Sequence, residues 1–161
     1  MGAIVAVNSL GSVLVPGGRH FWAGPFEMNK EFGGLGPSSA IVSGEDWGAA
    51  KRNPAARSNT TIACVATDVI LDPDECKRVA MMAQDGLARA IRPIHSPFDG
   101  DVVFALSTGK RTIDGPSRPF TVARIGSIAA DVLTRAVARG VYEATLPPGM
   151  SGQTWRTGTT G

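Results

Sequence analysis

The stretch RSNTTIACVATD, residues 57–68, changes from polar to apolar at its centre. Asn59, Thr60 and Thr61 stand directly before Ile62–Ala66, an apolar run that is typical of a buried strand. Two hypotheses explain the hydroxyl groups at this position. Either a polar turn launches the strand, or the chain is cut before Thr60 and this threonine becomes a new N-terminus.

An N-terminal threonine has the chemistry of a nucleophile. A threonine hydroxyl is almost never ionised at neutral pH, so it needs a base, and a free α-amino group with a pKa of roughly 7.7 to 8.0 is one. Such a cut suits this place, because the strand would fix Thr60 while the polar loop before it departs. Spacing alone nevertheless favours the strand launch over cleavage.

Asp99 and Asp101, on either side of Gly100, form a second candidate constellation. The common use of an Asp-Gly pair is a turn that opens a strand, here Val102–Leu106. The functional alternative is two carboxylates at the mouth of a sheet, where they would orient a nearby amine or hydroxyl. The residue types alone favour the turn.

Other chemistry is poorly supported. His20 and His95 have no G-x-S-x-G elbow near them and are expected to be structural or surface residues. Cys64 and Cys76 lack metal-ligand spacing, so we expect no metal and no other cofactor. The glycines in EFGGLG follow no strand and precede no G-K-[ST], which makes them turn formers rather than a phosphate loop.

The elements that must position these residues read as one α+β domain. Four short strands are predicted at 3–7, 12–15, 62–66 and 102–106, and two helices run from the Asp72 cap to about 90 and from 125 to about 142. Residues 16–59 are rich in Gly, Pro, Ser and Asn and irregular, and 111–120 are a polar connection.

Composition limits the partners and the compartment. A net charge of +2 over 161 residues is too weak to favour nucleic acid, and no apolar stretch is long enough for a membrane span. Two cysteines on separate elements fit reduced thiols. We therefore expect a cytoplasmic protein that binds neither nucleic acid nor a membrane.

Three segments together resemble the P1 family of self-processing peptidases: NTTIACVATD, MAQDGLARAIRPIHSPFDGDVVFALSTG, and GAIVAVNSLGS with PGGRHFWAGPFEMNKEFGGLG. This family includes aminopeptidase/D-amidases, β-peptidyl aminopeptidases and nylon-oligomer hydrolases. The sequence most resembles the nylon-oligomer (6-aminohexanoate oligomer) hydrolase branch, in which an Asn-Thr bond is cut. The resemblance covers about residues 2–144.

The resemblance implies a role for several residues. Asn59–Thr60 would be the autocleavage junction, with Thr60 as the catalytic nucleophile. Asp99 and Asp101 match the acidic pair that supports the N-terminal residue, and Asn8 matches an asparagine that stabilises the developing oxyanion. The implied protein is an αββα sandwich like the N-terminal-nucleophile hydrolases, assembled into homo-oligomers, that hydrolyses amide bonds in peptides, β-peptides or ω-amino-acid oligomers.

The family pattern also divides the chain. Residues 1–59 match the end of an α part, 60–145 a β part that carries the nucleophile, and 146–161 have the composition of a disordered tail. Compared with the family, the sequence looks truncated before Met1, where the strands and a lysine of the family's active site would lie. Two alternatives stay open: a non-catalytic assembly fragment, and an acyl transferase like the ornithine acetyltransferases.

Overall fold

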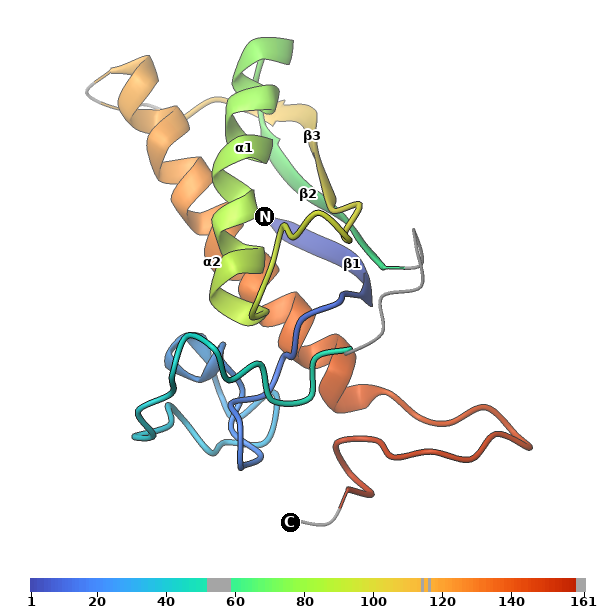
Figure 1. The fold of residues 1–161 in the computed structure, drawn as a ribbon. Coiled ribbons are helices and arrows are strands. Elements are labelled where there is room, and N and C mark those ends of the chain that lie inside the picture. The colour runs from blue at the N-terminus through green and yellow to red at the C-terminus, as the bar shows by residue number, and fades with distance from the viewer. Residues whose placement is uncertain (52–58, 114, 116, 159–161) are drawn as a thin grey trace.

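Three strands form one mixed sheet in the computed structural model (Figure 1). Strand β1 (Gly2–Asn8) runs antiparallel to β2 (Thr60–Val69), which runs parallel to β3 (Val102–Arg111). The strand order β1-β2-β3 makes β2 the central strand. The structure describes residues 1–51, 59–113, 115 and 117–158.

Two long helices, α1 (Pro73–Ala90) and α2 (Arg118–Glu143), pack side by side and cover one face of the sheet (Figure 1). Helix α1 begins as predicted, because Asp72 and Glu75 form a reciprocal capping box. The predicted start of the second helix is wrong, since α2 already begins at Arg118. Pro119 suits its first turn, where a backbone N–H is not needed.

The α+β class is confirmed by these layers. The predicted strand at 12–15 is wrong: Ser12 and Leu14 form only isolated bridges, to Arg92 and Phe21. The other strands are longer than predicted. Among the described residues, no helix combines the length and the apolar character that crossing a membrane requires.

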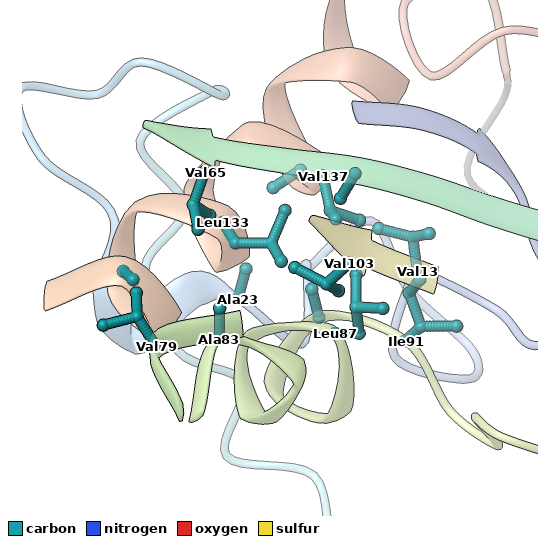
Figure 2. Packing of buried hydrophobic residues seen from close by; sticks show 14 of the residues in the cluster. Val13, Ala23, Val65, Val79, Ala83, Leu87, Ile91, Val103, Leu133 and Val137 are labelled. Carbon is teal, nitrogen blue, oxygen red and sulfur yellow. The ribbon is translucent and has the colours of Figure 1, made fainter. Parts of the chain in front are cut away.

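The hydrophobic core lies between the sheet and the helices (Figure 2). Val65 on β2 and Val103 on β3 face Leu87 of α1 and Leu133 of α2, and all four side chains are buried. Alternation along a strand places every second residue of β2 in this core. The core therefore fixes which residues at the start of β2 point inward.

The opposite, outer face of the sheet is apolar and exposed. Ile4 of β1 is 75% exposed and Phe104 of β3 is 57% exposed, and Ile62 and Leu106 are also exposed. These residues are close neighbours, because Cys64 of β2 pairs with both Ile4 and Phe104. One face of the sheet thus has a packed layer of helices and the other has none among the described residues.

The irregular segment that follows β1 is anchored to the helices. Glu31 accepts a hydrogen bond from Arg135 of α2 over 3.1 Å, and the Arg135 guanidinium holds the pKa of that carboxyl below its ordinary value. Phe32 beside it is buried in the core. These contacts hold the first part of the chain against α2.

The C-terminal segment also contacts this region. The Trp155 ring lies 4.7 Å from the ring of Tyr142 and stacks on Phe21, and its Nε1 donates to the carbonyl of Arg19. The composition of residues 146–161 predicts a disordered tail, but Trp155 packs against the core and its carbonyl oxygen accepts a hydrogen bond from Arg19.

We predict that Gly86→Ala lowers the free energy of unfolding by about 1–3 kcal/mol. A Cβ at Gly86 would lie 2.4 Å from the backbone oxygen of Ala130, so α1 and α2 would have to separate. The matched control is Gly140→Ala, at an exposed position of α2 whose nearest contact is 4.0 Å away. Urea titration should show that the control keeps or gains stability; equal losses in both would contradict the prediction.

Candidate active site

The Asn59–Thr60 junction lies where β2 begins, beside the end of β1 and the start of β3 (Figure 1). Pairing continues one residue upstream of β2, because Asn59 forms a parallel bridge with Asp99. In this bridge the Gly100 N–H donates to the Asn59 carbonyl oxygen over 3.1 Å. The peptide bond before Thr60 is therefore held at one end of the sheet, and the Asn59 residue is only 2% exposed.

Strand alternation distinguishes the two adjacent threonines. Thr61 points into the core and is 0% exposed, whereas Thr60 lies on the outer face and is partly exposed. The Thr60 Oγ1 donates to the Asn59 carbonyl oxygen over 2.6 Å. The threonine named as the candidate nucleophile is thus accessible and lies against the carbonyl group of the preceding residue.

Asp99 connects two loops beside the junction. Its Oδ1 accepts the N–H of Leu10 over 3.0 Å, and its Oδ2 accepts the hydroxyl of Ser96 over 2.7 Å. Leu10 follows β1 and Ser96 precedes β3, so this carboxylate holds the two strand ends together.

Asp101 holds the residue after the candidate nucleophile. Its Oδ1 accepts the backbone N–H of Thr61 over 2.9 Å, and its Oδ2 lies 3.1 Å from Nδ1 of His95. The Asp101 side chain is only 2% exposed, and that of His95 is 40% exposed. The Asp101 carboxylate therefore braces the backbone directly after Thr60.

Asn8 is the register partner of Thr60 across β1 and β2. Its Oδ1 lies 2.6 Å from Nζ of Lys51, which also donates over 3.0 Å to Oδ1 of Asn59. The structure thus brings together all four predicted site residues, Asn8, Thr60, Asp99 and Asp101, at one end of the sheet.

Two features of the site were not predicted from the sequence: the contacts of Lys51 with two asparagines and the contact of His95 with Asp101. Lys51 stood in a loop without periodicity, and no motif around it indicated a ligand or a partner. His95 and Asp101 are only six residues apart, and this short separation could have indicated that the two side chains meet. Among the described residues, no three His, Cys, Asp or Glu side chains are placed to hold a metal ion.

The model of peptidase family S58 matches residues 1–155. The chain belongs to peptidase family S58. Family S58 is the family of self-processing P1 peptidases that the three sequence segments predicted, so the predicted family is confirmed.

Curated relatives of this S58 chain include peptidases and amide hydrolases. It is 43% identical over 152 residues to an uncharacterized aminopeptidase of Mycobacterium leprae, a match that covers 89% of this chain and 41% of the relative. It is 48% identical over 94 residues to an uncharacterized aminopeptidase of Mycobacterium tuberculosis, covering 53% of the chain and 27% of the relative. A 6-aminohexanoate-oligomer endohydrolase of Kocuria sp. is 33% identical over 87 residues, covering 49% and 24%. The chain spans less than half the length of these relatives.

We predict that Asp101→Ala lowers the free energy of unfolding by about 1–3 kcal/mol, because it leaves the Thr61 N–H buried without an acceptor. Asp101→Asn should cost less, since its amide oxygen can still accept this hydrogen bond. The control is Asp68→Ala, which removes an exposed ion pair with Arg111 and should change stability by less than about 0.5 kcal/mol. Urea titrations at neutral pH would measure all three; a loss no larger than the control's would contradict the bracing role.

Proposed function

We propose that this chain is a self-cleaving amidohydrolase that cuts its own Asn59–Thr60 bond and then uses Thr60 as its nucleophile. The observation that carries the proposal is the position of Thr60 Oγ1, 2.6 Å from the Asn59 carbonyl oxygen. That same oxygen accepts the Gly100 N–H over 3.1 Å. The nucleophile and a donor for the developing negative charge thus meet at one peptide group.

The cut begins with attack of Thr60 Oγ1 on the carbonyl carbon of Asn59. Negative charge develops on the carbonyl oxygen, where the Gly100 N–H stabilises it. The C–N bond then breaks, and the proton lost by the hydroxyl ends on the Thr60 nitrogen. Water hydrolyses the resulting ester, which leaves a carboxylate on Asn59 and a free hydroxyl and α-amino group on Thr60.

The freed α-amino group supplies the base for turnover. It removes the proton of the Thr60 hydroxyl during attack on a substrate amide and passes this proton to the departing amine, which leaves an acyl-enzyme. Water then hydrolyses the acyl-enzyme, releasing the acid and regenerating the free hydroxyl and α-amino group of Thr60. Asn8, opposite Thr60 in the sheet, would donate to the oxyanion of this step. Asp101 would keep the nucleophile in place through the N–H of Thr61, and Asp99 would hold the end of β1 beside it through the N–H of Leu10.

The substrates are amides that end in, or contain, amino-acid units. The names of the relatives, aminopeptidase and 6-aminohexanoate-oligomer endohydrolase, support peptides with a free amino end, β-peptides or ω-amino-acid oligomers. The reaction needs no cofactor, because nucleophile, base and oxyanion donor are all supplied by the chain. The two free thiols, Cys64 and Cys76, support a cytoplasmic setting.

Intact-mass spectrometry of the purified chain tests the self-cleavage. We expect two pieces that meet between Asn59 and Thr60, and Thr60→Ala should leave one intact chain. Thr60→Ser should still cleave, because it keeps the hydroxyl. The matched control is Thr61→Val, whose hydroxyl faces the core without a partner among the described residues and should be dispensable.

An uncut wild-type chain would contradict self-cleavage of this polypeptide. Cleavage that persists in Thr60→Ala would assign the cut to another nucleophile or to a contaminating protease. Cut protein that transfers acetyl groups between amino acids instead of hydrolysing amides would favour the acyl-transferase alternative.

We further propose that the outer face of the sheet packs against a second sheet, which would complete the αββα sandwich. This proposal is supported by the exposed apolar side chains that β1, β2 and β3 present on one face, including Ile4 and Phe104. Apolar surface of this kind is normally covered in a folded protein. Assembly into homo-oligomers is part of the same proposal, and analytical ultracentrifugation would measure it.

Cys64 provides a probe of this face, because its side chain lies on the outer side of β2 between Ile4 and Phe104. In a Cys76→Ser background, we expect Cys64 to react with a maleimide at least tenfold more slowly under native conditions than in urea. Labelling of the native protein at the rate of the unfolded chain would contradict a covered face.

A further inference from the structure

Lys51 occupies a special position beside the cleavage junction. Its Nζ lies 2.6 Å from Oδ1 of Asn8 and 3.0 Å from Oδ1 of Asn59, and 3.4 Å from the Asn8 backbone oxygen. One ammonium group therefore joins the end of β1 to the residue that supplies the scissile carbonyl. We propose that Lys51 is a positioning residue for self-cleavage, an inference that rests on the proposed function.

Lys51 sets how the side-chain carboxamides of Asn8 and Asn59 are turned. An ammonium group has three donors and no acceptor, so an asparagine that binds it must present Oδ1 and turn its NH₂ group away. Lys51 thereby sets the orientation of Asn8 and Asn59 together. For Asn8, this directs Nδ2 away from Lys51 at the position opposite Thr60.

The contact with Lys51 also holds the buried side chain of Asn59. Asn59 is 2% exposed, and its Nδ2 has no hydrogen-bond partner among the described residues. Its Oδ1 contact with Lys51 is charge-assisted, which makes it stronger than a bond between neutral groups. Loss of this contact would leave a buried carboxamide with neither end anchored, next to the bond that has to be attacked.

These contacts of Lys51 all lie on one side of the proposed cut between Asn59 and Thr60. Asn8, Lys51 and Asn59 all belong to the piece that ends at Asn59, whereas Thr60 begins the other piece. Lys51 therefore fixes the acyl side of the scissile bond and leaves the nucleophile free to act. The carboxylate of Asp101 holds the other side, through the N–H of Thr61, and the carboxylate of Asp99 joins the two sides through the N–H of Leu10.

The test measures the rate constant of cleavage in the full chain, followed by mass spectrometry after cell-free synthesis. We expect Lys51→Met to slow cleavage by about 10- to 100-fold, as misplacement of a reacting group does. Lys51→Arg should recover most of the rate, because a guanidinium can donate to both amide oxygens. The charge-matched control, Lys110→Met, changes an exposed lysine near the far end of β3 and should cleave at the wild-type rate.

A second comparison separates positioning from a general loss of structure. If Lys51 acts through the Asn59 carboxamide, Lys51→Met should slow cleavage much less in an Asn59→Ala background than in the wild type. The proposal is overturned if Lys51→Met cleaves at the wild-type rate, if Lys51→Arg is as slow as Lys51→Met, or if the effect is undiminished in the Asn59→Ala background. Each of these results leaves the proposed function standing, whereas an uncut wild-type chain contradicts both.

Discussion

The hydrogen bond from the Gly100 N–H to the Asn59 carbonyl is the contact on which the site depends. It extends the parallel pairing of β2 and β3 beyond the regular strands, so the residue before Thr60 cannot swing as a free loop would. A Cβ at Gly100 would lie 3.0 Å from Thr60 Oγ1, so a larger residue at this position would press against the hydroxyl. One backbone contact thus holds the peptide group to which the Thr60 hydroxyl donates.

The register of β2 decides which hydroxyl is available. A shift of one residue would exchange the two faces of the strand and place Thr60 in the core. Ala63 and Val65, both 1% exposed, oppose such a shift because they are packed against the helices. Thr60 and Thr61 have identical side chains, but the packing of the hydrophobic core leaves only the hydroxyl of Thr60 accessible to solvent.

Local patterns were sufficient to predict the elements around the site, whereas the roles of its residues were predicted only from the family resemblance. The capping box at Asp72, the apolar run after Thr61 and the Asp-Gly pair before β3 are short-range signals, and the structure has the corresponding elements. The contact of Leu10 with Asp99 spans 89 positions, and Lys51 reaches Asn8 across 43. Such contacts depend on how loops return to the sheet, and no periodicity in the Gly- and Pro-rich segment encodes that path. The same limit applies to Ser12, whose bridge partner Arg92 lies far along the chain.

The division of contacts at the junction bears on what a cut would do to the molecule. β1 pairs with β2 along its whole length, and Leu10 binds Asp99, so both contacts cross from the piece before the cut to the piece after it. Breaking the Asn59–Thr60 peptide bond at the start of β2 would remove none of these interactions. The two pieces would remain one folded unit, and the new amino group of Thr60 would lie at the start of β2, where Thr60 pairs with Asn8. A nucleophile generated by the proposed cut would stay in place, because the pairing of β2 with β1 and β3 that holds the Asn59–Thr60 bond would also hold the new N-terminus.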